Sequence, residues 1–116
     1  MPVIIYHNPR CSKSRQTLAL LEENNVSPEI VKYLDDTPSS EQLQTLLKQL
    51  GYNSARDMMR TKEALYKELA LGEDSVTEQQ LFEAMAANPK LIERPIVVNG
   101  DKAAMGRPPE QVLTIL

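Results

Sequence analysis

The sequence predicts an α/β fold, with a four-stranded mixed sheet flanked by helices and a helical insertion in the middle of the chain. Three observations lead to this prediction. Short apolar runs typical of buried strands occur at residues 3–6, 30–34 and 96–98, towards both ends of the chain. A helical pattern separates the first two runs, and helix-start sequences fill residues 39–88. The last run leads directly into a hairpin signal.

The first third of the chain predicts a strand, a helix and a second strand. Residues 3–6 form the first apolar run, which Asn8 and Pro9 end. We expect a helix over about 12–24, with Leu18 and Leu21 on one face, and a strand over 30–34. Because a helix joins the two strands, they are expected to form a right-handed crossover with a parallel pair.

The middle of the chain predicts helices that begin with capping boxes, in which an N-cap hydroxyl and a side chain three residues later bond backbone amides reciprocally. The pairs are Ser39 with Gln42, Ser54 with Asp57, and Thr77 with Gln80. The apolar stripes expected to face the core are Leu43, Leu46, Leu47 and Leu50; Leu65 and Leu69; and Leu81, Phe82 and Met85. Gly51 and Asn88 with Pro89 are expected to end the first and last of these helices.

The last third predicts two strands and a helix. Asn99 with Gly100 is a two-residue hairpin signal between strands at 96–98 and 102–105. Pro108 and Pro109 are expected to open a terminal helix. Its inward-facing residues are predicted to be Val112, Leu113 and Leu116. This is the thioredoxin-like order of elements with a helical insertion at about 39–88, so residues 1–116 are expected to form a single domain.

Composition excludes several classes of protein. The 116 residues are 41% hydrophobic and 25% charged, as in ordinary globular domains. No apolar run approaches the roughly 20 residues of a membrane span, and the N-terminus does not resemble a signal peptide. One cysteine cannot form an internal disulfide, so a cytoplasmic protein is expected. The net charge of −3 argues against nucleic-acid binding, and we find no metal-ligand cluster or glycine-rich nucleotide loop.

Cys11 is the candidate catalytic residue. It lies between the first strand and the first helix, where backbone amides and the helix dipole favour an anion and lower the pKa of a thiol. Arg10, Lys13 and Arg15 crowd the same helix start, where cations are normally unfavourable. A bound oxyanion beside a nucleophilic sulfur would explain them. The alternative is a small buried cysteine that only packs.

Other candidate residues depend on the expected fold. His7 either tunes the Cys11 thiol or is an ordinary loop histidine. Arg94 precedes the third strand, and in a thioredoxin-like fold that segment passes beside the start of the first helix, close to Cys11. A guanidinium group at Arg94 would suit an oxyanion, because it donates two parallel hydrogen bonds and stays charged. Arg60 and Arg107 also stand out, and each of the three arginines has the alternative of a solvated surface charge. Pro95 can take a cis peptide bond, although base rates favour trans.

The spacing around Cys11 limits the chemistry. Ser14 stands where a C-x-x-C motif has its second cysteine, so a dithiol mechanism is excluded. A phosphatase-type loop has an arginine six residues after its cysteine, and this chain has Thr17 there. A single thiol must obtain its second sulfur from another molecule.

Together these segments resemble the glutaredoxin-coupled arsenate reductase (ArsC) family over essentially the whole chain. The residues that carry the resemblance are Tyr6, His7, Asn8, Pro9, Cys11, Ser14, Arg15, Tyr33, Leu34, Met58, Met59, Arg60, residues 94–98, Arg107 and Pro108. The resemblance implies an enzyme of arsenic detoxification. In its mechanism Cys11 forms a thiol–arsenate adduct, glutathione condenses on the arsenic, and glutaredoxin supplies further reducing equivalents. No bound cofactor or metal is implied.

The same resemblance implies roles for individual residues. Arg60, Arg94 and Arg107 match oxyanion-binding arginines of the family. His7 matches a position that helps to depress the pKa of the cysteine, and the Ser14 hydroxyl matches one that hydrogen-bonds the thiolate. Arg15 completes this expected thiolate-tuning set.

Three other interpretations remain open. The least favoured is a degenerate binding module without turnover, because Cys11 and the arginines are intact. A transcriptional regulator of the Spx type shares the fold and binds RNA polymerase, but such proteins typically carry a C-x-x-C switch, which this chain lacks. A thiol-dependent reductase acting on another substrate fits a single thiol equally well. Only the arginines favour an inorganic oxyanion such as arsenate.

Overall fold

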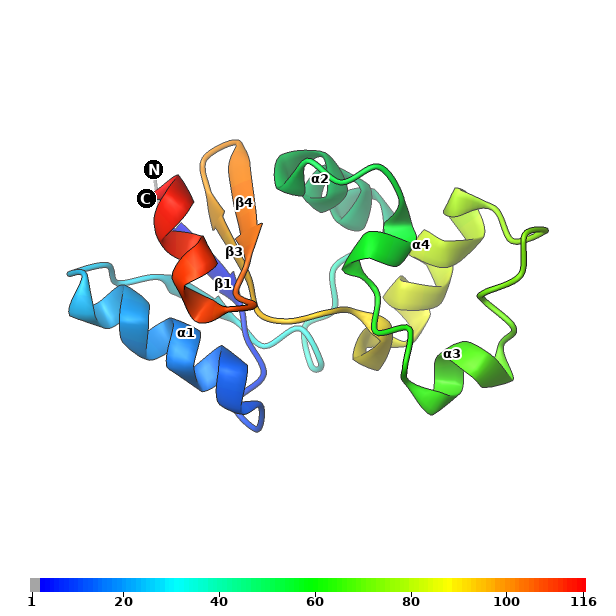
Figure 1. The fold of residues 1–116 in the computed structure, drawn as a ribbon, viewed down its shortest axis with the longest axis horizontal. Helices are drawn as coiled ribbons and strands as arrows, with labels where there is room; N and C mark the ends of the chain where they lie inside the picture. The colour runs from blue at the N-terminus through cyan, green and yellow to red at the C-terminus, as the bar shows by residue number, and fades with distance from the viewer. Residues whose placement is uncertain (1–2) are drawn as a thin grey trace. The chain divides into compact units, whose positions relative to one another are not determined.

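The computed structural model describes residues 3–116, which form two compact units (Figure 1). One unit, here the sheet unit, comprises the described chain up to Asp36 together with Arg94–Leu116. The other, the helical unit, comprises Thr37–Glu93. The assignment of residues 1–116 to a single domain, with an insertion at about 39–88, stays a prediction.

The sheet unit contains the predicted four-stranded mixed sheet. Its strands are β1 (Val3–Tyr6), β2 (Glu29–Val31), β3 (Ile96–Asn99) and β4 (Lys102–Met105), in the order β2-β1-β3-β4. β1 is parallel to β2 and antiparallel to β3, and β3 is antiparallel to β4. The helix α1 (Ser12–Glu23) joins the parallel pair, as expected for a crossover connection. These features confirm the thioredoxin-like α/β fold.

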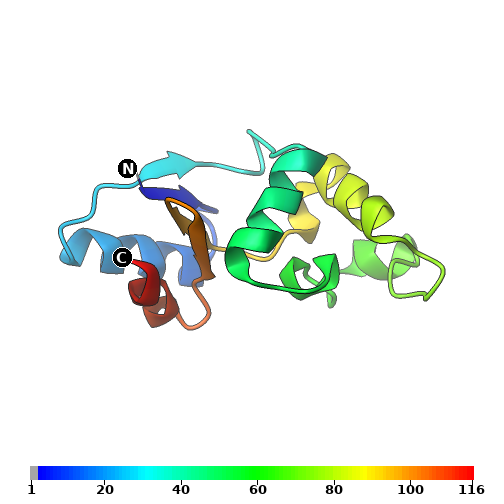
Figure 2. The same cartoon turned by 90° about the horizontal axis from the view of Figure 1, so that it is seen from above.

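One face of the sheet is covered by α1 and a C-terminal 3₁₀ helix, Pro109–Ile115 (Figures 1 and 2). Ile5 and Val97 are register partners on β1 and β3, so their side chains leave the same face. Leu21 of α1 and Val112 of the 3₁₀ helix pack with them in one fully buried cluster. Burial of these apolar side chains fixes α1, and therefore the residue that precedes it, against the end of β1.

The structure corrects two local predictions about the strands of the sheet unit. β2 covers residues 29–31 instead of 30–34, because a turn follows in which the amides of Asp35 and Asp36 both donate to the Lys32 carbonyl, at 2.9 and 2.8 Å. The hairpin turn consists of Gly100 and Asp101, since Asn99 pairs with Lys102. Gly100 has φ 66°, so glycine supplies the positive φ at the first turn position.

The terminal helix is a 3₁₀ helix, and this changes which residues face inward. Val112 is fully buried as predicted, but Leu113 and Leu116 are 39% and 45% exposed. Three residues per turn place positions 109, 112 and 115 on one side of the helix, whereas an α-helical period predicts a different set. Pro109 is accordingly buried and Ile115 is partly buried against the core cluster.

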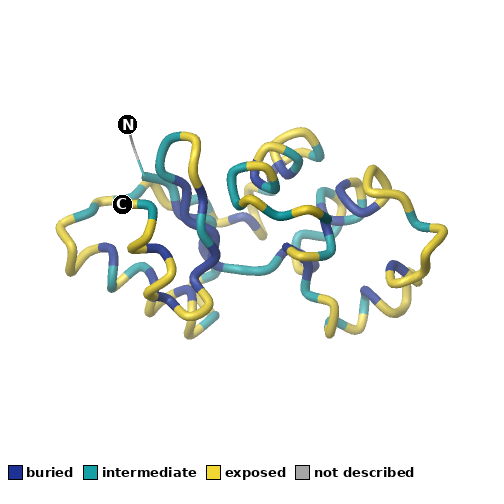
Figure 3. The backbone as a smooth tube through the Cα atoms, turned by 45° about the horizontal axis from the view of Figure 1, so that its top comes forward, coloured by how far each residue is buried: buried dark blue, intermediate teal, exposed yellow. Residues whose placement is uncertain are grey.

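The helical unit contains α2 (Ser40–Leu50), a 3₁₀ helix (Ala55–Met58), α3 (Ala64–Glu68), α4 (Glu78–Ala87) and a second 3₁₀ helix (Pro89–Leu91). All three predicted capping boxes form with both reciprocal hydrogen bonds. Gly51 ends α2 in the left-handed region at φ 76°. Figure 3 shows buried positions recurring along these helices. The inward-facing stripe predicted on Leu65 and Leu69 is wrong in part: Leu69 lies beyond the short α3 and is 45% exposed.

None of the helices formed by residues 3–116 has the length and apolar character that a membrane span requires.

Candidate active site

Cys11 is the N-cap residue of α1. Its backbone is extended, with φ −94° and ψ 125°, as N-cap residues usually are. The Cys11 amide donates to the Asn8 carbonyl at 3.0 Å, and the Cys11 carbonyl accepts from the Arg15 amide at 3.0 Å. The loop after β1 therefore delivers the thiol to the positive end of α1, where its side chain is only partly buried.

Three kinds of group act on the Cys11 thiol. Burial by itself raises the pKa of the thiol, but the backbone amide of Ser14, the Arg94 charge and the amide of Lys13 outweigh it and bring the pKa below its usual value. The Cys11 side chain makes no capping hydrogen bond of standard geometry. The two amides therefore stabilise the thiolate as dipoles oriented towards the sulfur, and not through a capping hydrogen bond of standard geometry. The thiolate is the reactive form of cysteine.

Two predicted oxyanion-binding arginines, Arg94 and Arg107, lie beside Cys11. Nη2 of Arg107 is 3.9 Å from the Cys11 Sγ, and its Nε donates to the Arg94 carbonyl oxygen at 2.8 Å. The Arg94 side chain also hydrogen-bonds the sulfur, which further lowers the pKa of the thiol. Nε and Nη1 of Arg94 are buried, so this charge is held in place and only weakly screened. Both guanidinium groups stand where an oxyanion attacked by the thiolate would develop charge.

The segment that carries these arginines is fitted closely to α1. The Arg94–Pro95 and Arg107–Pro108 peptide bonds are cis, so of the two forms that the sequence left open for Pro95 the structure has the cis form. The Gly106 amide donates to the Pro95 carbonyl at 2.9 Å. A Cβ added at Gly106 would lie 2.5 Å from Thr17 Oγ1 and 2.7 Å from Pro95 Cγ. Only a glycine lets the end of β4 approach α1 this closely.

Gly106 and Thr17 are residues that the sequence analysis missed as parts of this arrangement. Thr17 is buried on the face of α1 that also carries Ser14 and Leu21, and its hydroxyl donates to the Lys13 carbonyl at 2.8 Å. The available signal was the glycine placed directly before Arg107, since a glycine next to a functional residue often marks a close backbone approach.

His7 and Ser14 form a buried pair behind the Cys11 loop. His7 Nδ1 is 2.7 Å from Ser14 Oγ, and the Asn8 amide donates to the same oxygen at 3.0 Å. Burial, and then the Lys32 charge, lower the pKa of His7, which suits a neutral imidazole that accepts at Nδ1. The hydroxyl of Ser14 thus has His7 and Asn8 as partners, while the backbone amide of Ser14 acts on the Cys11 sulfur. The predicted role of the hydroxyl at the thiolate stays a prediction.

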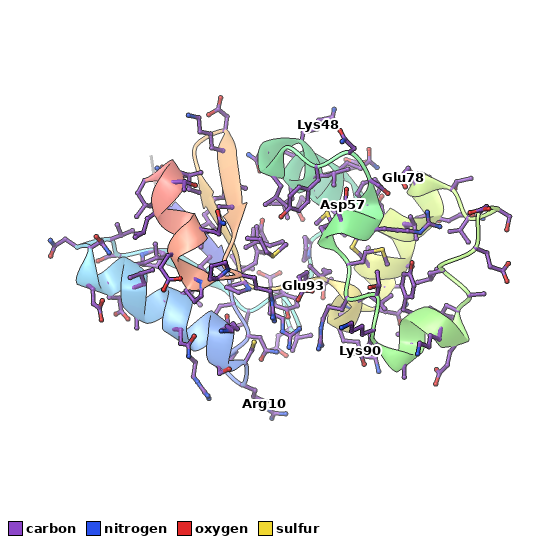
Figure 4. All side chains as sticks on the ribbon, in the orientation of Figure 1. Arg10, Lys48, Asp57, Glu78, Lys90 and Glu93 are labelled. Atoms are coloured by element: carbon purple, nitrogen blue, oxygen red, sulfur yellow. The ribbon has the colours of Figure 1, made fainter. Side chains whose placement is uncertain are left out.

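The remaining basic residues of the loop are exposed. Figure 4 shows Arg10 projecting from the chain at the start of α1. The Arg10 amide donates to Asn8 Oδ1 at 3.0 Å, which tightens the turn before Cys11. Arg15, a predicted tuning residue, lies with Nη1 3.4 Å from the Pro9 carbonyl and so braces the same loop. Lys13 is exposed on the first turn of α1.

Arg60, the third predicted oxyanion-binding arginine, belongs to the helical unit. Its amide donates to the Leu91 carbonyl at 2.8 Å, and its Nη1 is 3.1 Å from Glu63 Oε2. The structure describes Arg60 only among residues of that unit, so its role at the thiol stays a prediction. Within residues 3–116, no three His, Cys, Asp or Glu side chains are grouped as a metal site.

The fold and the site define a class of protein: a thioredoxin-like protein with one activated thiol and arginines beside it. Residues 6–115 match the ArsC family. Because this match spans most of the 116 residues, the chain belongs to the ArsC family.

Individual relatives extend this result. The chain is 61% identical to the uncharacterized protein YfgD of Escherichia coli K12, over 98% of this chain and 96% of that protein. It is 55% identical to an arsenate reductase of Haemophilus influenzae, over 100% of both chains. The structure of an arsenate reductase from Vibrio cholerae superposes with a TM-score of 0.98 at 60% identity, covering 100% of this chain and 98% of that one.

Proposed function

We propose that this protein is an arsenate reductase in which Cys11 is the nucleophile and glutathione and glutaredoxin supply the electrons. The observation that carries the proposal is the Cys11 thiol, whose pKa is lowered and which lies beside the side chains of Arg94 and Arg107. The names of close relatives support arsenate as the oxyanion.

In the first step the Cys11 thiolate attacks arsenic(V). A sulfur–arsenic bond forms, an arsenic–oxygen bond breaks, and the departing oxygen takes up protons and leaves as water; arsenic stays in the +5 state. The guanidinium groups of Arg94 and Arg107 offset the negative charge that the thiolate and arsenate bring together. Arg60 is proposed as a third ligand of the oxyanion.

The electrons must come from thiols of other molecules, because Cys11 is the only cysteine in the sequence. Glutathione displaces a second arsenic oxygen as water and gives a Cys11–arsenic–glutathione adduct. A glutaredoxin thiolate then attacks the glutathione sulfur. The electron pair of the sulfur–arsenic bond stays on arsenic, which is reduced to +3, and a glutathione–glutaredoxin disulfide leaves. Hydrolysis of the Cys11–arsenic bond releases arsenite and restores the thiol.

The test is arsenate-dependent oxidation of NADPH in the presence of glutathione, glutathione reductase and glutaredoxin. We expect turnover that needs both arsenate and glutaredoxin and that disappears in the Cys11→Ser variant, whose folding is checked by circular dichroism. Turnover that persists in Cys11→Ser would disprove the mechanism. A folded protein with a reactive Cys11 but no arsenate turnover would favour another thiol-dependent substrate, and binding of RNA polymerase would favour the regulatory alternative.

A further inference from the structure

A second feature of the sheet unit lies next to the Cys11 loop and has no role in the steps above. It is a cavity of about 290 Å³. The loop after β1 and the turn after β2 form its walls, and its lining residues are His7, Asn8, Pro9, Arg10, Lys32, Leu34 and Asp35. We call it the β2-side cavity.

Both walls of the β2-side cavity are fixed by backbone hydrogen bonds. The His7 amide donates to the Val31 carbonyl at 2.8 Å, which ties the loop to the end of β2. On the other wall, the Lys32 carbonyl accepts from two amides of the following turn. The cavity is therefore preformed, as small-molecule sites usually are.

The charges on these walls are one anion and two cations. Arg10 and Lys32 are positive and Asp35 is negative, while the lowered pKa of His7 keeps the imidazole neutral near pH 7. Among residues 3–116, no ion pair joins Asp35 to either cation. The three charges are thus available to a ligand that carries two negative groups and one positive group.

The sheet order places this cavity on a defined side of the thiol. β1 lies between β2 and β3, so the turn after β2 and the segment before β3 flank the loop after β1 from opposite sides. Arg94 and Arg107 belong to the β3–β4 side, and the β2-side cavity belongs to the other. A substrate on the arginines leaves the cavity open for a second reactant.

We propose that the β2-side cavity binds one end of glutathione, the second thiol of the reaction. This inference rests on the proposed function, which requires a thiol from another molecule. At neutral pH glutathione has two carboxylates and one ammonium group, which complement Arg10, Lys32 and Asp35. A small thiol reductant without carboxylates would not use this set of charges.

Size and reach agree with partial binding. A volume of about 290 Å³ lies just below the roughly 300–1,000 Å³ of small-ligand sites, so the cavity holds an end of the tripeptide and not the whole. Arg10 on the cavity wall is directly followed by Cys11. A three-residue chain spans at most about 10 Å when extended, so its thiol can reach the arsenic on Cys11 from an anchored end.

The charges of this cavity are solvent-exposed, so each contributes little and the effect of one substitution is limited. We expect Lys32→Gln to weaken binding about two- to fivefold, and Lys32→Glu on the order of tenfold, because reversal adds repulsion. Lys102→Gln is the matched control, since Lys102 is an exposed lysine of the same unit on β4, away from the cavity.

The first experiment measures binding without chemistry. S-methylglutathione, which keeps all three charges and cannot react, is titrated into the ¹⁵N-labelled protein and followed by NMR. We expect shifts at the amides of His7, Lys32 and Asp35, weaker binding in Lys32→Gln, and unchanged binding in Lys102→Gln. The diethyl ester of S-methylglutathione, which lacks both carboxylates, is expected to bind more weakly than S-methylglutathione itself, by on the order of tenfold.

The second experiment measures the KM for glutathione in arsenate turnover, which should rise in Lys32→Gln by a similar factor. Shifts confined to other residues, equal affinity of Lys32→Gln and the unchanged protein, or equal binding of the diester would each overturn the inference. Thioether binding at the cavity without arsenate turnover would leave this site standing and refute only the proposed function. Arsenate turnover without binding at the cavity would refute only this inference.

Discussion

Adding one methyl group at Gly106 tests the geometry on which the candidate active site depends. In Gly106→Ala the new Cβ would lie 2.5 Å from Thr17 Oγ1 and 2.7 Å from Pro95 Cγ, while ordinary contacts begin at 3.4 Å. The end of β4 must therefore move away from α1 by about 1 Å, or α1 must shift by as much. Gly106 has no positive φ, so the effect comes from this contact and not from backbone strain.

The displacement acts directly on the arginine pair. Arg107 follows Gly106 in the chain, and its guanidinium bridges the Arg94 carbonyl at 2.8 Å and the Cys11 sulfur at 3.9 Å. A misplacement of about 1 Å can cost on the order of 100-fold in rate. Overpacking a core contact also costs about 1–3 kcal/mol of stability, which corresponds to a fall in Tm of roughly 4–12 °C for a domain of this size.

The assay compares kcat/KM for arsenate, the Tm and the pH profile of Cys11 alkylation. Gly72→Ala is the control, since a Cβ at Gly72 would meet Tyr66 Cε1 at an ordinary 3.4 Å. We expect a loss of about 100-fold in kcat/KM for Gly106→Ala and little change for Gly72→Ala. Adding Thr17→Ala removes two of the three close contacts and should restore part of the loss.

A Gly106→Ala protein with unchanged kcat/KM and unchanged Tm would refute this reasoning. It would mean that the β4 end tolerates the methyl group without moving, or that the position of Arg107 does not matter for the reaction. A fall in Tm with unchanged kcat/KM in the folded protein would separate these two explanations. It would show that the methyl group disturbs the packing of the β4 end against α1, and that the position of Arg107 does not matter for the reaction.

Two further predictions concern Cys11 itself. The pKa of the Cys11 thiol is lowered in the folded protein. The rate of alkylation by iodoacetamide should therefore reach half its maximum at a pH below the free-thiol pKa of about 8.5, and it should fall as the pH drops further. A midpoint at or above that pH would contradict the role of the Ser14 and Lys13 amides and of Arg94. Cys11→Ser should abolish turnover and raise the Tm, because the cysteine makes no capping hydrogen bond and a serine N-cap is worth about 0.5–2 kcal/mol. The Tm is measured by thermal denaturation, with circular dichroism as the check on folding. An equal or lower Tm with unchanged circular dichroism would mean that the serine hydroxyl cannot form the capping hydrogen bond.

The fold was predictable wherever local sequence determines it. All three capping boxes and the extent of β1 follow from neighbouring residues, and the structure has them. The errors lie where tertiary packing decides. The terminal helix has 3₁₀ geometry, so Leu113 is exposed. β2 is shorter than predicted, because a turn around the Lys32 carbonyl follows it. Apolar pattern alone does not separate a 3₁₀ helix from an α-helix of the same length.

The site was predictable in its local part and not in its long-range part. Cys11 at a helix start follows from the strand, the break and the helix that surround it. The closeness of Arg94 and Arg107 to the thiol depended on the fold expected from the element order, and the structure brings both to Cys11. The fit of Gly106 against Thr17 joins residues about 90 positions apart, and no local pattern reports such a contact.

The start of α1 differs from the starts of the other long helices in a way that bears on function. α2 and α4 each begin with a hydroxyl capping box and an acidic residue in the first turn, Glu41 and Glu78. α1 has neither: its N-cap is Cys11, without a capping bond, and its first turn has no acidic residue. Such features normally stabilise a helix by neutralising the positive charge of its N-terminus. At α1 no such group offsets the positive partial charge, which therefore stabilises the Cys11 thiolate. The start of α1 is less stable as a helix end for the same reason, at the position where the reactive sulfur lies.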